Sequence, residues 1–359
     1  GGGGAYPYLG DPRPLGDAMA SIEARAIDKR GNTGYSPTVY VQVGAGARES
    51  VQVRGQDRAM WIWEAASYNL ILNPGSRRLL ATTAGDTATF GSRPITTLYV
   101  GVDRFGGQDM LYDNRPEVRD FVRWAHAQGF QVYATIAGGT QPPFLGGLER
   151  YHRRAVREME KILNYNLASA PEERFDGVNV DIEPYIHPDF APGKPALQVQ
   201  WLEILEKMIQ RRDAAGSGLV FGPAVPRWLD TSACCQDITW KGRTRPLSEH
   251  IQDMVDYISI MDYRDTADGS VGIIEQARNE IEYAEAIGKP NSVVIGVETL
   301  DIAWSGDPET ITFREEGRAV AERELAKVYE AFADSPAFGG VAMHHYDSIR
   351  WLPSVWGPN

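Results

Sequence analysis

Short apolar runs recur along the chain from about Arg58 onward, every ~35–47 residues, as expected of buried strands in a regular α/β fold. The eight runs are Met60–Trp63, Thr96–Val102, Gln131–Ile136, Val178–Ile182, Leu219–Ala224, Tyr257–Met261, Val293–Val297 and Gly340–Met343. The pattern predicts eight strands at regular spacing.

Amphipathic helical patterns fill most of the gaps between these runs. Apolar residues follow helical spacing in Arg115–Gln128, Leu148–Ala168, Ala196–Ala215 and Ser270–Ile287. Thr312–Glu315 has the form of a capping box and predicts a helix running to about Ala333. After the last run only Ser348–Trp351 can form a helix. Alternating strands and helices predict an α/β fold, a (β/α)8 TIM barrel, over a doubly wound open sheet, because no glycine-rich nucleotide turn is present.

The first 56 residues have a different pattern. Ser21–Ile27 and Thr38–Val43 read as two strands joined by a turn-rich segment. The segment Ala24–Pro37 resembles the last hairpin of a fibronectin-type or immunoglobulin-like module. Two strands do not form an independent sandwich. We therefore expect residues 1–56 to be a short β segment of an incomplete module, and residues 57–359 to form the barrel.

Composition and charge limit the classes of partner that the chain is expected to bind. The 359 residues are 43% hydrophobic and 23% charged, with a formal net charge of -12. An acidic chain is a poor partner for nucleic acid or an anionic membrane surface, and no apolar run reaches the ~18 residues of a membrane helix. Cys234 and Cys235 are adjacent, and neighbouring cysteines rarely pair, so no disulfide is expected. We expect an extracellular or cell-surface location.

The fourth run carries polar residues at every second position. Asn179, Asp181 and Glu183 alternate with apolar residues, so a strand here would place the three on one face, with Pro184 at its end. In a (β/α)8 barrel the active site lies at the carboxyl ends of the strands. This predicts that Asp181 and Glu183 face the active site.

Other candidates follow the remaining strands and are mainly acids and aromatics. Carboxylates supply acid and base, and aromatic faces supply flat apolar surfaces, a combination that suits sugars. We expect an oligosaccharide or polysaccharide substrate, with no cofactor and no metal ion. The expected substrate-binding residues are Trp63, Glu64, Asp103, Asn179, Trp228, Asp262, Glu298, His344 and Tyr346.

Four segments resemble family 18 glycoside hydrolases, the chitinase and endo-β-N-acetylglucosaminidase group. Asp176–Glu183 is similar to the fourth-strand D-G-x-D-x-D-x-E signature of that family. Thr135–Gly139, Ser259–Tyr263 and Gly339–Met343 resemble its third, sixth and eighth strands. The resemblance implies substrate-assisted hydrolysis of an N-acetylhexosamine-containing glycan. In that scheme Glu183 is the general acid, while Asp181 and Tyr263 hold the acetamido group that acts as nucleophile.

Two features depart from that family, and two alternatives remain open. Asn179 stands where the family has an aspartate, and His344 and His345 stand where it tends to have tryptophan. Glu183 and Glu298 also fit a retaining scheme in which Glu298 is the nucleophile, if their carboxyls lie ~5–5.5 Å apart. A barrel that binds carbohydrate without cleaving it is the non-enzymatic alternative.

Overall fold

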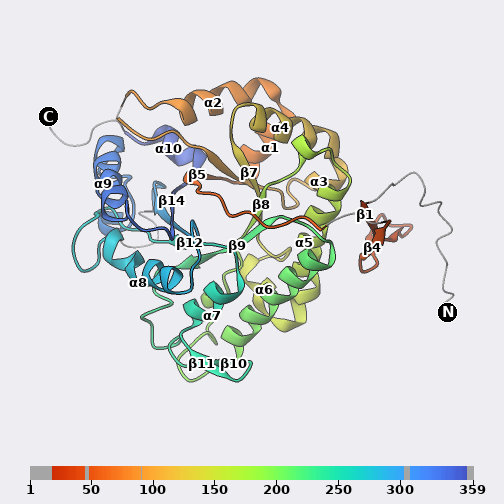
Figure 1. Ribbon diagram of the computed structural model, residues 1–359. Helices are drawn as coiled ribbons and strands as arrows, with labels where there is room; N and C mark the ends of the chain where they lie inside the picture. Colours follow the sequence, from red (N-terminus) through yellow and green to blue (C-terminus); the bar gives the residue numbers. More distant parts are fainter. Residues whose placement is uncertain (1–17, 45–47, 90, 303–307, 354–359) are drawn as a thin grey trace.

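Eight parallel strands close into a barrel in the computed structural model, which describes residues 18–44, 48–89, 91–302 and 308–353 (Figure 1). The barrel is formed by β5 (Asp57–Ile62), β6 (Thr97–Gly101), β7 (Gln131–Ile136), β8 (Gly177–Val180), β9 (Val220–Pro226), β12 (Ile258–Met261), β13 (Val293–Glu298) and β14 (Phe338–His344). The strands follow this order around the barrel, and β14 pairs with β5 to close it. The predicted (β/α)8 fold is confirmed.

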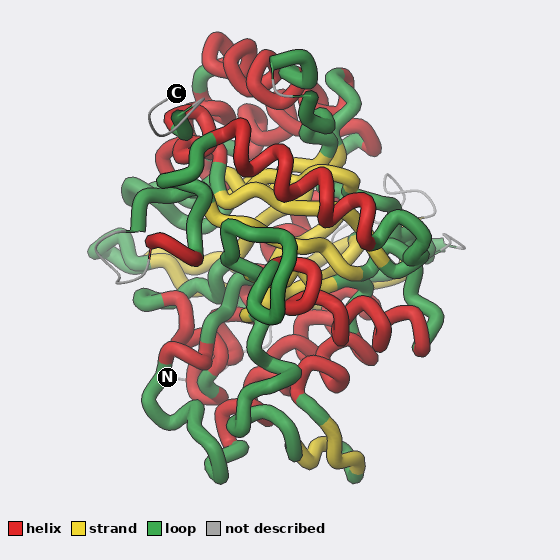
Figure 2. The backbone as a smooth tube through the Cα atoms, turned by 90° about the vertical axis from the view of Figure 1, so that its left-hand side faces the viewer, coloured by secondary structure: helices red, strands yellow, loops and turns green. Residues whose placement is uncertain are grey.

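Helices surround the strands on the outside, and Figure 2 shows them above and below the central strands. They are α1 (Glu64–Leu72), α2 (Arg77–Gly85), α3 (Met110–Asp113), α4 (Arg115–Ala127), α5 (His152–Leu167), α6 (Ala196–Ala214), α7 (Leu247–Met254), α8 (Ile273–Ala286), α9 (Arg318–Ala331) and α10 (Tyr346–Trp351). None of the described helices is long and apolar enough to cross a membrane.

The predicted capping box at Thr312–Glu315 is wrong. The helix α9 begins only at Arg318, after Gly317 adopts a φ of 80°. The Thr312 hydroxyl instead donates to the Leu300 carbonyl at 2.8 Å, and Thr312 forms a β-bridge with Glu298. These contacts with the end of β13 hold the segment as a loop.

Two apolar layers hold the barrel together. Inside the strands, large aromatic side chains fill the lumen, among them Trp61, Tyr99, Tyr133 and Tyr257, all nearly inaccessible. Outside, the opposite faces of the strands pack against the helices, as Val178 and Val180 do. The two layers are the consequence of strand alternation, which sends successive side chains inward and outward.

The N-terminal segment forms two small antiparallel sheets in place of the single hairpin expected. β1 (Ala18–Ile22) pairs with β4 (Val39–Val43), and β2 (Arg25–Ile27) pairs with β3 (Thr33–Tyr35). The segment packs on the helical layer: Arg157 of α5 lies 3.8 Å from the Tyr35 ring centre, and the Tyr112 hydroxyl donates to Glu23 at 2.9 Å. These contacts fasten the β segment to the barrel (Figure 1).

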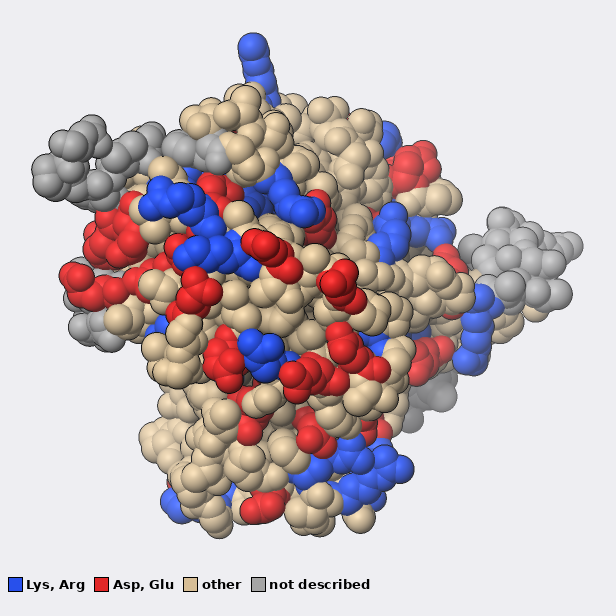
Figure 3. Space-filling view, turned by 60° about the vertical axis from the view of Figure 1, so that its left-hand side comes forward, with Lys and Arg blue, Asp and Glu red and all other residues tan. Residues whose placement is uncertain are grey.

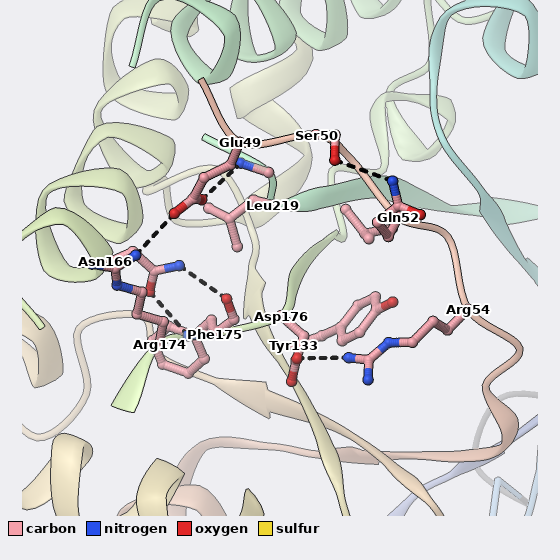
Figure 4. A pocket seen from close by; sticks show the side chains of 12 residues that line it. Glu49, Ser50, Gln52, Arg54, Tyr133, Asn166, Arg174, Phe175, Asp176 and Leu219 are labelled. Atoms are coloured by element: carbon pink, nitrogen blue, oxygen red, sulfur yellow. Dashed lines mark hydrogen bonds and ion pairs between the residues drawn. The ribbon is translucent and has the colours of Figure 1, made fainter. Parts of the chain in front are cut away.

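Residues 48–56 form a strap across the amino-terminal ends of the strands. Arg54 pairs with Asp176 at 2.8 Å, Glu49 pairs with Arg174 at 2.9 Å, and the Tyr99 hydroxyl donates to the Gln56 side chain inside the barrel. A pocket of about 290 Å³ lies between the strap and the strands (Figure 4). It is at the opposite end of the barrel from Asp181 and Glu183, and its charged side chains largely neutralise one another, as the two ion pairs show.

The expectation about the cysteines is wrong, because a disulfide joins Cys234 and Cys235. The two residues lie in a turn closed by a hydrogen bond of 3.0 Å from the Cys235 amide to the Ser232 carbonyl, and both side chains are buried. The same long segment also contains a short hairpin, β10 (Ile238–Trp240) with β11 (Arg243–Arg245), at the edge of the molecule (Figure 1).

On the face shown in Figure 3, acidic and basic side chains lie interspersed.

Candidate active site

Asp181 and Glu183 lie just beyond the carboxyl end of β8. The regular strand ends at Val180, earlier than the sequence pattern predicts, although the Asp181 amide still donates to the Ile136 carbonyl of β7 at 2.8 Å. Pro184 then opens a short 3-10 helix that ends at Ile186. The two carboxylates therefore sit at the strand end where barrel enzymes keep their chemistry.

Asn179 lies one layer deeper and is inaccessible to solvent. Its side-chain oxygen accepts from the Trp61 indole at 2.9 Å, and its nitrogen donates to Tyr257 at 3.1 Å and to Ser259 at 2.9 Å. The amide thus joins three strands inside the barrel and has no free group to offer a ligand. Asn179 was expected to bind substrate, but the structure places its side chain out of reach of a ligand, as a support beneath Asp181.

Asp181 and Glu183 are both half-buried and electrostatically linked. Burial, then the charges of Glu183 and Asp103, raise the pKa of Asp181 well above its ordinary value. Burial also raises the pKa of Glu183, against the opposing effects of a hydrogen bond from Tyr185 and of nearby His344. The Oδ1 atom of Asp181 has no hydrogen-bond partner within the described ranges. A raised pKa lets a carboxyl keep its proton to higher pH than usual, which favours a role as general acid.

Tyr263 faces the same carboxylates from the end of β12. Burial, then the charges of Glu298, Asp181 and Glu183, raise the pKa of its hydroxyl well above the ordinary value. Its ring lies 5.7 Å from that of His344. The structure thus brings together the expected catalytic residues Glu183, Asp181 and Tyr263 at one end of the barrel.

Glu298, His344 and Trp63 form a hydrogen-bonded chain beside this group. His344 Nδ1 lies 2.9 Å and 3.0 Å from the two carboxylate oxygens of Glu298, and the Trp63 indole donates to His344 Nε2 at 3.0 Å. Glu298 is only 4% exposed, whereas Trp63 and His344 are half-buried. Three expected substrate-binding residues therefore form one connected unit.

Asp103 lies at the same level of the barrel as Asp181, two strands away. It follows β6 and accepts from the Ala137 amide at 2.8 Å, while its other oxygen is buried without a partner in the described part of the chain. Burial and the neighbouring Glu158 carboxylate raise its pKa to about 7. Glu158 can approach because Gly139, at a φ of +64°, has no side chain: a Cβ there would lie 2.8 Å from Glu158 Oε1.

Replacing Asp103 with asparagine should stabilise the protein at pH 8 and have little effect at pH 4. The raised pKa means that the folded state favours the protonated carboxyl, so stability falls as pH rises from about 4 to about 7. A pKa shift of three units changes the free energy of unfolding by at most about 4 kcal/mol. Coupling to the neighbouring acids makes this change smaller. Thermal melting at both pH values, with the exposed Asp334→Asn as control, measures the difference. A loss of stability of equal size at both pH values would contradict the assignment.

Tyr185 is a site residue that the sequence reasoning missed. Its hydroxyl donates to Glu183 Oε1, and its ring lies 5.4 Å from the ring of Trp228, an expected substrate-binding residue. The sequence signal that could have identified it is an aromatic residue two positions after Glu183, in the short 3-10 helix that follows. Tyr185 fixes the direction of the Glu183 carboxyl and connects it to an aromatic cluster with Phe190 and Trp201.

Two expected substrate-binding residues lie apart from this group. Asp262 is inaccessible, has neither oxygen partnered within the described residues, and interacts electrostatically with Arg227 and Arg264. Tyr346 is 4% exposed and packs in the core between strands and helices. Both are therefore outside the proposed site. The side chain of Glu64 lies outside the described part of the chain.

The fold and the site define a class: a (β/α)8 barrel with clustered carboxylates and aromatic residues at the carboxyl ends of its strands. Within the described ranges, no group of three or more His, Cys, Asp or Glu side chains is arranged to hold a metal ion. The carboxylates of this group can transfer protons and stabilise positive charge.

Comparison with known proteins gives structural matches only. A chitinase from Rhizomucor miehei matches with a TM-score of 0.45 and 14% identity, over 82% of this chain and 95% of that one. An endo-β-N-acetylglucosaminidase from Cordyceps militaris matches with a TM-score of 0.44 and 12% identity, over 82% of each chain. A family 18 chitinase mutant from Cycas revoluta in complex with (GlcNAc)4 matches with a TM-score of 0.45 and 12% identity, over 81% of this chain and 95% of that one.

No family model and no curated protein matches the sequence. The barrel is established by its own strand order, and the resemblance to family 18 continues to rest on the residues at the strand ends.

Proposed function

We propose that the protein is a glycoside hydrolase that cleaves glycans containing N-acetylhexosamine by substrate-assisted catalysis with retention of configuration. Glu183 donates a proton to the glycosidic oxygen as the bond to C1 breaks. The carbonyl oxygen of the substrate's own acetamido group bonds to C1, and Asp181 and Tyr263 hold that group. Glu183, now a carboxylate, takes a proton from the water that then opens the cyclic intermediate.

The observation that carries the proposal is the contrast between Glu183 and Glu298. Glu183 is half-buried, has a raised pKa and lies near Asp181, as a general acid requires. Glu298, the nucleophile of the alternative scheme, is 4% exposed, and its carboxylate accepts from the Thr299 and Leu300 amides at 2.8 Å as well as facing His344. A carboxylate so fully hydrogen-bonded is poorly placed to attack a sugar carbon, so the substrate is the better source of the nucleophile.

The disulfide supports the expected extracellular or cell-surface location. Disulfides persist mainly in oxidising compartments, and the disulfide of Cys234 and Cys235 is buried within the segment that connects β9 to α7. Glycans are abundant substrates outside cells, which agrees with the proposed reaction.

The function is tested by comparing N-acetylglucosamine oligomers with matched simple hexosides, with and without a thiazoline that mimics the cyclic intermediate. We expect hydrolysis of the acetamido sugars only, and strong inhibition by the thiazoline, because both depend on the acetamido group. Cleavage of plain hexosides without inhibition, together with a covalent adduct on Glu298, would favour the two-glutamate scheme.

A further inference from the structure

A chain of hydrogen bonds connects three neighbouring strands at the proposed site. Glu298 ends β13, His344 ends β14, and Trp63 follows β5, which is the next strand around the barrel. Glu298 lies 2.9 Å from His344 Nδ1, and the Trp63 indole nitrogen lies 3.0 Å from His344 Nε2. The side chains are thus linked in the order carboxylate, imidazole, indole.

The chemistry of the indole determines which imidazole nitrogen carries the proton. An indole N–H can only donate, so His344 Nε2 must be the acceptor and is not protonated. The single ring proton of neutral His344 is then on Nδ1, where it is donated to Glu298. A doubly protonated ring would place a second donor against the Trp63 N–H, and the hydrogen bond between the two rings would be lost.

Glu298 is itself held firmly as an acceptor. The Thr299 and Leu300 amides donate to its Oε1 atom, both at 2.8 Å, and its side chain is 5% exposed. Backbone amides at a strand end cannot rotate away, so the carboxylate keeps its direction. The His344 ring is therefore oriented by a rigid element of the barrel.

The far end of the chain is an aromatic ring next to the catalytic group. Trp63 is half-buried and packs against the aromatic cluster that fills the lumen. His344, to which it is bonded, lies 5.7 Å from the Tyr263 ring, and Glu183 lies within electrostatic range of both residues. A tryptophan that is only partly buried, and whose N–H is fixed by a hydrogen bond, is suited to stack on the apolar face of a pyranose ring.

We propose that Glu298 and His344 are positioning residues that hold the Trp63 indole as the stacking surface for one pyranose ring of the glycan beside Glu183. The proposal rests on the proposed function for the identity of the ligand, whereas the hydrogen-bonded chain itself is independent of any activity. It assigns Glu298 the role of orienting a histidine.

The chain is tested first in the protein without ligand. Nitrogen NMR of the ¹⁵N-labelled full chain distinguishes the two imidazole tautomers, and His344→Asn identifies the signal among the six histidines. We expect a proton on Nδ1 of His344, and we expect Trp63→Phe, which keeps a ring but removes the N–H, to change the Nε2 shift. A proton on Nε2, or no response of His344 to Trp63→Phe, would overturn the chain.

The stacking surface is tested with N-acetylglucosamine tetrasaccharide. Trp63→Ala should weaken its binding to the Glu183→Gln protein roughly tenfold, and Trp63→Phe less, because a ring remains. His344→Phe should raise KM more than it lowers kcat, measured in the protein that retains Glu183. The melting temperature of this variant checks that it is folded. Unchanged binding by Trp63→Ala in a protein that hydrolyses the glycan would refute the stacking role alone. Absence of any glycan binding would refute both the stacking role and the proposed function, while the tautomer measurement would still decide the hydrogen-bonded chain.

Discussion

Replacing Glu183 with glutamine is expected to lower the rate of glycan hydrolysis by about 10²–10⁴-fold while oligosaccharide binding remains measurable. Glutamine has nearly the same shape, and its side-chain oxygen can still accept the hydrogen bond from Tyr185, so the site keeps its geometry. What the variant lacks is a proton that can pass to the glycosidic oxygen. Initial rates on an N-acetylglucosamine oligomer, together with calorimetric titration of the same oligomer, separate the two effects.

A matched control is Glu172→Gln, because Glu172 is exposed and lies before β8, at the opposite end of that strand from Glu183. It should leave both rate and binding unchanged. If the Glu183 variant retains full activity on every glycan that the wild-type protein cleaves, Glu183 is not the acid. If the wild-type protein binds such glycans but cleaves none, the alternative of a non-catalytic carbohydrate-binding barrel is favoured.

The second large effect is expected from Asp181→Asn, which should reduce kcat by about 10²–10³-fold. In substrate assistance the acetamido nitrogen becomes partly positive as its carbonyl oxygen attacks C1. This positive charge favours the ionised form of Asp181, against the burial and the neighbouring acids that raise its pKa in the free protein, and the carboxylate stabilises the charge. The amide keeps the volume and a hydrogen-bond acceptor but not the charge. Affinity for the thiazoline should fall in parallel with kcat, since the inhibitor imitates the charged intermediate.

The same variant discriminates between the two schemes. In a two-glutamate mechanism Asp181 would have only an indirect effect on the rate, through the Glu183 pKa. A decrease of less than about fivefold, with thiazoline affinity unchanged, would therefore count against substrate assistance.

The barrel could be predicted because its strands are local in sequence and buried on both faces. β7 has the bounds Gln131–Ile136 that the apolar run predicts, and α4 ends at Ala127, just before Gly129. Each of these signals is contained within about a dozen residues. The closing of the sheet then follows from the number and spacing of the strands.

The errors arise where distant contacts override a local pattern. Thr312 carries a capping-box signal, yet its hydroxyl bonds to Leu300 and the helix begins six residues later, at Arg318. The pairing of Cys234 with Cys235 depends on a turn whose curvature a sequence pattern does not reveal.

The composition of the site was predictable in part. Asp181, Glu183 and Tyr263 follow strands in recognisable segments, and the barrel brings their ends together. The bond between Trp63 and His344 joins residues 281 positions apart and depends on the closure of β14 against β5. The burial of Asp262, which excludes it from the site, is known only from the structure, because the sequence shows two polar residues in succession after the strand.

The strap at residues 48–56 determines where the N-terminal segment and the barrel could be separated. Its side chains complete the floor of the barrel: Gln56 meets Tyr99 within the lumen, and Arg54 meets Asp176 at the start of β8. If the strap were removed, Tyr99 would lose its hydrogen bond to Gln56, and Asp176 would lose its ion pair with Arg54. Residues 48–56 are therefore part of the folded barrel, and a truncation that preserves the barrel would have to cut the chain before residue 48.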